Sequence, residues 1–200
     1  MPMTRVITDV PQDRVNFVVS LIRFDGGTVE LQPEADGEVT IIATFPDEPS
    51  PMIAEAAPDS SEFSWMKVAE AELGVQEDAT GSNPRIEAYH ATTRGGSAPD
   101  SVHWCSSFVN FCVERAGFKG TDSKASRSWL NWGQEAADFV PGCIVVLKRG
   151  APPMGHVGFF VGSEAGRIHL LGGNQGNKVG IAAFDADRVL ARRVAAQGTA

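Results

Sequence analysis

The chain contains three cysteines and four histidines, the side chains best suited to nucleophilic chemistry. Cys105 lies in the first turn of a predicted helix, after a polar loop at 94–99. A helix N-terminus carries partial positive charge and unpaired N–H groups, which lower the pKa of a thiol and can stabilise an oxyanion. This position predicts a nucleophile. The alternative is that Cys105, like Cys112 and Cys143, is a small buried hydrophobe.

A nucleophilic thiol needs a base, and His156 is the histidine best placed to be one. It opens a predicted strand in the sequence GHVGFFVG. We expect Gly155 and Gly158 to leave open space beside the ring, while the apolar strand holds its backbone. His103, two residues before Cys105, is the rival base.

The imidazole of such a base needs a partner on its second nitrogen, usually a carboxylate or an amide. The glycine-rich segment GGNQGNK at 172–178 offers Asn174, which we predict in this role. The alternative is that Asn174 and Asn177 only adopt the positive-φ conformations of a glycine-rich turn.

Metal chemistry is the competing interpretation of these residues. His103 and Cys105 have a ligand-like spacing, and His156 could be a third ligand. The chain has no CxxC or HExxH motif. We therefore predict neither a metal site nor a cofactor.

Composition limits what the chain can be. Two hundred residues, 42% hydrophobic and 21% charged, are enough for one globular domain and a smaller segment. The net charge of −8 argues against nucleic acid as a partner, because phosphate binding needs clustered lysine and arginine. The chain has no apolar run long enough to span a membrane and no signal-peptide pattern. We expect it to be made in the cytoplasm without a signal peptide.

The chain divides by composition into three parts. Residues 1–46 are predicted to be a small β-rich segment, because β-branched and aromatic residues dominate Val15–Phe24 and a turn signal follows at Asp25-Gly26-Gly27. Residues 47–62 are a proline-rich linker, and 63–200 form the main domain. The strands predicted in the first part are Val15–Phe24, Thr28–Leu31 and Val39–Phe45.

The main domain changes period halfway along. Apolar spacing and capping residues predict helices from Phe63, from Asn83-Pro84, from His103 or Trp104 to Gly117, and over Ser123–Trp132. Short apolar runs then predict strands. Helices followed by an antiparallel sheet define an α+β fold. The strands are expected at Cys143–Leu147, His156–Gly162, Arg167–Leu171, Lys178–Ala182 and Val189–Val194.

The order of the candidate residues, a cysteine that opens a helix, a histidine that opens a strand and then a polar residue, resembles that of the CHAP group of cell-wall amidohydrolases. That group belongs with the NlpC-type enzymes in the papain-like cysteine-peptidase superfamily. The resemblance is to CHAP-like phage and bacterial proteins, spans about Phe63–Val194, and is carried by WCSSFVN, ASRSWLNWG, GHVGFFVG and LLGGNQGN. It implies a papain-like fold with N-terminal helices packed on an antiparallel sheet.

The resemblance also implies roles for individual residues. Cys105 would be the nucleophile, His156 the base and Asn174 the polar third member. Many CHAP enzymes carry an acidic residue two positions before an asparagine, where this chain has Gly172. The third role then falls to Asn174, as in the Cys-His-Asn version of the triad.

Further residues enter the site by the same resemblance. Related NlpC-type enzymes supply a tyrosine upstream of the cysteine, which makes Tyr89 a candidate oxyanion donor beside the Cys105 backbone N–H. Trp104, His103 and Trp129 are candidates for the substrate groove. The alternative for Trp129 is a place in the core, since it is three residues from Trp132.

The family's substrate is peptidoglycan. We expect a hydrolase that cuts an amide bond, as a muramoyl-L-alanine amidase or as a stem or cross-bridge endopeptidase, through an acyl-enzyme. Its context would be a phage endolysin or a secreted antibacterial effector, acting in the periplasm or cell wall after holin release or secretion-system delivery. Residues 1–46 are a candidate contact for an immunity or delivery protein.

Two other classes of function stay open: a non-catalytic interaction module, and a toxin that acts on protein amides. Because an acidic protein gains little electrostatic help from an anionic wall, we expect recognition to depend on groove fit.

Overall fold

The computed structural model describes residues 2–10, 12, 14–24, 26–34, 37–46 and 63–196. The chain forms two compact units, Met1–Ser61 and Glu62–Ala200, each of which is described here by itself. The proline-rich linker predicted at 47–62 lies outside the described residues. Within them, no helix is both long and apolar enough to span a membrane.

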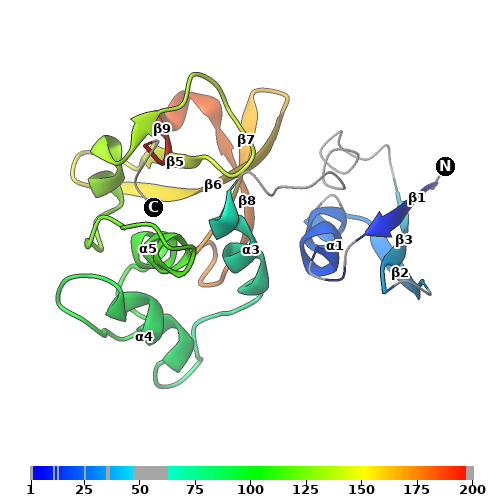
Figure 1. The fold of residues 1–200 in the computed structure, drawn as a ribbon, viewed down its shortest axis with the longest axis horizontal. Coiled ribbons are helices and arrows are strands. Elements are labelled where there is room, and N and C mark those ends of the chain that lie inside the picture. The colour runs from blue at the N-terminus through cyan, green and yellow to red at the C-terminus, as the bar shows by residue number, and fades with distance from the viewer. Residues whose placement is uncertain are drawn as a thin grey trace. The chain divides into compact units, whose positions relative to one another are not determined.

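The first unit contains a three-stranded antiparallel sheet in the order β1-β3-β2 and one helix, α1 (Figure 1). The strand predicted over Val15–Phe24 was wrong, because this segment is helix α1. Val15, Val18 and Ile22 are buried at helical spacing, and Phe17, Val19 and Leu21 are buried as well. Packing of the helix, which includes contacts with the sheet, therefore outweighs the β propensity of these residues. The strands are β1 (Met3–Val10), β2 (Thr28–Pro33) and β3 (Val39–Phe45).

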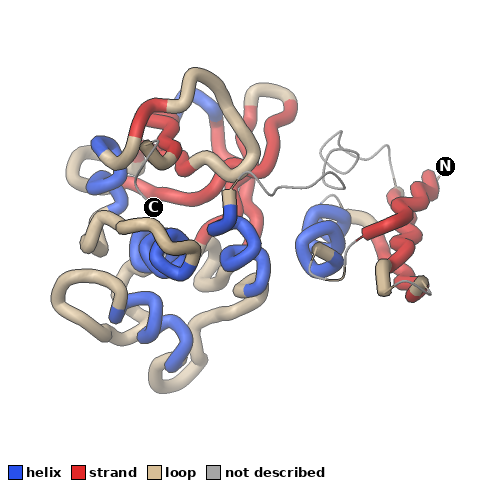
Figure 2. Tube along the Cα trace, in the orientation of Figure 1, coloured by secondary structure: helices blue, strands red, loops and turns tan. Residues whose placement is uncertain are grey.

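The second unit is the α+β fold expected from the sequence, with helices on a six-stranded antiparallel sheet in the order β4-β9-β5-β6-β7-β8 (Figures 1 and 2). The helices are α3 (Ser64–Ala71), α4 (Pro84–Ala91) and α5 (Cys105–Arg115), with short 3-10 helices η1 (Ser126–Asn131) and η2 (Ala186–Arg188). The strands are β4 (Gln134–Glu135), β5 (Ile144–Lys148), β6 (Gly155–Glu164), β7 (Arg167–Gly172), β8 (Gly180–Asp185) and β9 (Val189–Val194).

Helix α5 is central to this unit, because it packs on β6 and β7 and both α3 and α4 pack against it. The predicted signals of α4 and α5 are confirmed, whereas the helix predicted over Ser123–Trp132 is reduced to the 3-10 helix η1. Asn83 caps α4 by accepting a hydrogen bond from the Arg85 N–H at 2.8 Å, with Pro84 as the first helical residue. Gly117, at φ +89°, follows the end of α5.

The sheet is buried on both faces, as the residues of β5 show. Ile144 and Val146 belong to the core beneath the helices, whereas Val145 and Leu147 belong to a second core on the opposite face. β5 pairs with β6 from Ile144 opposite Phe159 to Lys148 opposite Gly155, and this register places His156 opposite Leu147.

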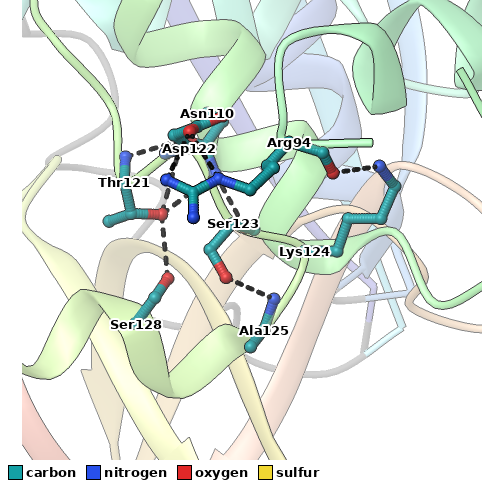
Figure 3. Close-up of polar contacts among 8 residues, drawn as sticks. All are labelled: Arg94, Asn110, Thr121, Asp122, Ser123, Lys124, Ala125 and Ser128. Atoms are coloured by element: carbon teal, nitrogen blue, oxygen red, sulfur yellow. Dashed lines mark hydrogen bonds and ion pairs between the residues drawn. The ribbon is translucent and has the colours of Figure 1, made fainter. Parts of the chain in front are cut away.

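Asn110, fully buried on α5, holds the segment that follows the helix (Figure 3). Its Oδ1 accepts hydrogen bonds from the backbone N–H groups of Thr121 at 2.7 Å and Asp122 at 3.2 Å. Its Nδ2 donates to the carbonyl oxygens of Ser106 at 2.9 Å and Ser123 at 3.1 Å. One side chain thus fixes this segment relative to the first turn of α5.

Replacing Asn110 with alanine should lower the free energy of unfolding by about 3 kcal/mol, because the backbone groups that it pairs would be left without partners. Urea unfolding measures this loss. Asn131→Ala, at an exposed position, is the matched control and should stay within about 0.5 kcal/mol of the unchanged protein. Equal stability of the two variants would contradict the structural role of Asn110.

Candidate active site

A cavity of about 120 Å³ lies at the start of α5. Its wall combines the segment before η1, the loop between β5 and β6, the first residues of β6 and the turn after β7. Cys105 and His156, distant in sequence, both line it. The lining residues are His103, Cys105, Lys124, Ala125, Ser126, Arg149, Pro153, Met154, Gly155, His156 and Asn174.

Cys105 is the first residue of α5. The hydrogen bond from the Phe108 N–H to the Trp104 carbonyl, at 2.9 Å, begins the helical ladder, so the N–H groups of residues 105–107 precede it. Burial raises the pKa of the Cys105 thiol, and hydrogen bonds from the backbone N–H groups of Val157 and Ser106 oppose this effect. The Val157 contact brings the sulfur against the residue that follows His156.

The predicted lowering of the thiol pKa does not hold overall. Burial raises the pKa of Cys105 above its ordinary value, and the helix N–H groups and the charge of Arg149 oppose this only in part. The helix terminus favours the thiolate, but Cys105 is only 7% exposed and its charged form is therefore poorly hydrated. The resting thiol is therefore protonated.

His156 is the second residue of β6 and is almost fully buried, with the ring of Phe184 at 5.2 Å between centroids. Burial lowers the pKa of His156 to about 4, although its hydrogen bond with Gln175 acts in the opposite direction. The imidazole is consequently neutral near pH 7. A neutral imidazole has one nitrogen free to accept a proton.

Gln175 is the hydrogen-bond partner of His156, with 3.0 Å between Nε2 of the histidine and Oε1 of the glutamine. Nε2 of Gln175 donates to the carbonyl oxygens of Leu170, at 3.0 Å, and Gly180. Since carbonyls only accept, the amide nitrogen must face them and its oxygen must face the histidine. Nε2 of His156 then carries the hydrogen, and Nδ1 is the basic nitrogen.

The structure thus differs from the prediction that Asn174 orients His156. Asn174 lines the cavity, but its Nδ2 donates to Oε1 of Glu77 at 3.0 Å. Asn174 and Asn177 have φ of +56° and +62°, so the turn conformations considered as the alternative are present. The change of chain direction at Asn174 gives the next residue, Gln175, access to the histidine. The motif LLGGNQGN contained both amides, and only the backbone conformation distinguishes them.

Glu77 was not foreseen, because it belongs to the segment between α3 and α4 and to no motif. Its Oε1 accepts hydrogen bonds from Nε1 of Trp104 at 2.9 Å and from Nδ2 of Asn174 at 3.0 Å. The residues that carry these donors, Trp104 and Asn174, immediately precede Cys105 and Gln175 in the chain. One carboxylate therefore links the backbone beside the thiol to the backbone beside the amide that holds the imidazole.

The tyrosine expected as an oxyanion donor is elsewhere. Tyr89 is fully buried, its hydroxyl donates to Oε2 of Glu72 at 2.6 Å, and its ring packs against Trp104 and Phe111. Glu72 also pairs with Arg85. Tyr89 is committed to this buried network and does not line the cavity.

Of the three groove candidates, His103 lines the cavity and is exposed. Trp104 and Trp129 are both fully buried in the core and are not among the lining residues. Nε1 of Trp129 donates to Oγ of Ser106 at 3.0 Å, which ties η1 to the first turn of α5. The core alternative for Trp129 is the one observed.

Gly155 and Gly158 do not leave open space. A Cβ at Gly155 would lie 2.7 Å from Oγ of Ser126, and one at Gly158 would lie 3.0 Å from the Leu171 carbonyl oxygen. These glycines instead allow η1 and β7 to approach β6 closely. Among the residues that the structure describes, no group of three or more His, Cys, Asp or Glu side chains is placed to hold a metal ion.

Residues 97–174 match the CHAP domain family. The match includes both Cys105 and His156 and ends one residue before Gln175. No curated protein matches the chain. The family fits the observed fold, in which a cysteine opens a helix that packs on an antiparallel sheet. Residues 97–174 of the chain are therefore a CHAP domain, a domain of the papain-like cysteine amidohydrolase family.

Proposed function

We propose that this protein hydrolyses an amide bond in peptidoglycan, with Cys105 as the nucleophile, His156 as the base and Gln175 as the residue that positions the base. CHAP domains are generally cysteine-dependent amidohydrolases, and the family implies peptidoglycan as the substrate. One observation carries the assignment of roles. A cavity joins the thiol at the start of α5 to a histidine whose far nitrogen is held by an amide.

The reaction begins from a neutral pair, because burial favours the uncharged forms of both groups. The thiol proton moves to Nδ1 of His156 as sulfur bonds the amide carbonyl carbon. The developing oxyanion receives hydrogen bonds from backbone N–H groups at the start of α5, where the helix dipole also favours negative charge.

Collapse of this intermediate breaks the carbon–nitrogen bond, and the imidazolium gives its proton to the departing amine. A water molecule then loses a proton to the same imidazole and attacks the thioester. The acyl group leaves as a carboxylic acid, and the thiol regains its proton. Throughout, Gln175 accepts the Nε2 hydrogen and keeps Nδ1 directed at the reacting groups.

Cys105→Ala should lower the release of new amino groups from purified sacculi by at least about a thousand-fold, because no other thiol lines the cavity. Cys143→Ala is the matched control and should keep most of the activity, since Cys143 is buried in the core on the opposite face. Mass spectrometry of the fragments identifies the bond cut.

Activity that survives Cys105→Ala would contradict the nucleophile. Intact sacculi with cleaved protein substrates would favour the protein-directed toxin, and no cleavage of either would favour the non-catalytic module.

Gln175→Ala should lower kcat by roughly 10- to 100-fold with little change in KM, because Gln175 fixes the imidazole without lining the cavity. Initial rates on a soluble peptidoglycan fragment separate the two constants. Asn174→Ala is the comparison and should retain more of the kcat. A larger kcat loss for Asn174→Ala would return the third role to that residue.

The neutral state of His156 makes stability depend on pH. Its folded pKa of about 4 lies below the ordinary 6.5, so the unfolded chain binds a proton between these values when the folded chain does not. The neutral imidazole contributes about 3 kcal/mol to the free energy of unfolding. This contribution is fully present above pH 6.5 and is lost as the pH falls through 4.

Urea unfolding at pH 7 and pH 4 measures this effect. The wild type should lose about 3 kcal/mol more between the two values than His156→Gln does. His103→Gln, at an exposed position, should lose as much as the wild type. Equal losses in wild type and His156→Gln would refute a buried neutral imidazole.

A further inference from the structure

The charge of the cavity is opposite to that of the chain. The protein carries a net charge of −8, but the cavity lining includes His103, Lys124, Arg149 and His156 and no aspartate or glutamate. His156 is neutral, which leaves Lys124 and Arg149 as the permanent positive charges of the wall. Local charge, rather than net charge, acts on a group bound in a cavity.

Lys124 is already occupied. Its ammonium group donates hydrogen bonds to Oγ1 of Thr93 at 2.9 Å and to the carbonyl oxygens of Arg94 at 3.2 Å and Gly96 at 2.8 Å. An ammonium group has three hydrogens, so these bonds use all of its donors. Lys124 fastens the 93–96 turn to the cavity wall and has no donor left for a ligand; Figure 3 shows its bond to the Arg94 carbonyl.

Arg149 is different. It follows β5 directly, is exposed, and makes no hydrogen bond, ion pair or ring contact with any residue that the structure describes. Four other cations of this unit have carboxylate partners: Arg85 with Glu72, Arg94 with Asp122, Lys148 with Asp187 and Arg167 with Asp185. Arg149 thus lines the cavity with all five guanidinium donors unused, and its charge acts on both Cys105 and His156.

Adjusting the proton transfer does not explain this arginine. Its charge lowers the pKa of Cys105, which favours the thiolate, and lowers the pKa of His156, which disfavours the imidazolium. Moving a proton from the thiol to the imidazole creates both ions, so the two effects oppose each other. The donors of Arg149 are suited instead to an anionic group that arrives with the substrate.

We propose that Arg149 binds a carboxylate of the substrate beside the amide bond that is cut, and so selects peptides with a free carboxylate over their amidated forms. This proposal rests on the proposed function. The planar guanidinium matches a carboxylate with two parallel hydrogen bonds, which a lysine cannot reproduce. Recognition by charge at this point replaces the expectation that groove fit alone selects the substrate.

The test measures binding without turnover, in the full chain carrying Cys105→Ala. The two probes are the peptide N-acetyl-L-alanyl-γ-D-glutamyl-L-lysine amide, in which the glutamyl α-carboxylate is the one free carboxylate, and the same peptide with that group as a carboxamide. Isothermal titration calorimetry should give a Kd about ten-fold lower for the free carboxylate at low salt. Adding Arg149→Gln should remove the difference, and Arg149→Lys should restore only part of it.

Lys119→Gln is the matched control, because it removes the same charge at an exposed position that does not line the cavity. It should keep the preference. Equal Kd values for the two peptides, a preference that survives Arg149→Gln, or no binding of either peptide would overturn the proposal. Hydrolysis of sacculi by the wild type is scored separately, so the proposed function can stand when this inference fails, and a carboxylate preference can stand when hydrolysis fails.

Discussion

The active-site arrangement depends on the orientation of one amide group. Gln175 directs its nitrogen to two backbone carbonyls, which leaves its oxygen for His156 and determines which imidazole nitrogen is basic. A carboxylate in this position would add a charge that stabilises the imidazolium. The amide fixes the tautomer without that charge, so a buried histidine remains neutral beside a buried thiol.

Neutrality at rest has a physical cost and a benefit. A thiolate and an imidazolium in this enclosed position would each lose hydration, which the few backbone N–H groups directed at the sulfur replace only in part. In the proposed mechanism, the ions form only when a substrate carbonyl is present to take up the charge. Reaction of the thiol with other electrophiles is correspondingly slower, since the thiolate is the reactive form.

Elements with strong local signals were predictable from the sequence, and two of them, α5 and β6, place Cys105 and His156 in one cavity. Asn83-Pro84 began a helix and Val39–Phe45 formed a strand as expected. Val15–Phe24 was misassigned because its β-branched residues suit a strand, whereas the segment forms a helix that packs on β2 and β3. The hydrogen-bond partner of His156 could not be predicted from local sequence, because the positive φ of Asn174 directs Gln175, rather than Asn174, to the histidine. Tyr89 and Trp129 do not line the cavity, because their rings are fully buried in the core.

The contact made by Glu77 bears on how the site is lost as well as how it is held. The segment that carries it is also tied to the turn after β7 by a hydrogen bond from its backbone N–H to the Asn177 carbonyl, at 2.8 Å, and by the bridge between Gln76 and Lys178. Local opening of this segment would release Trp104 and Asn174 together. The backbone amides beside Cys105 and beside Gln175 would then exchange their hydrogens with one common protection factor, as a single cooperative unit. The stability of that unit is set by residues that take no part in the chemistry.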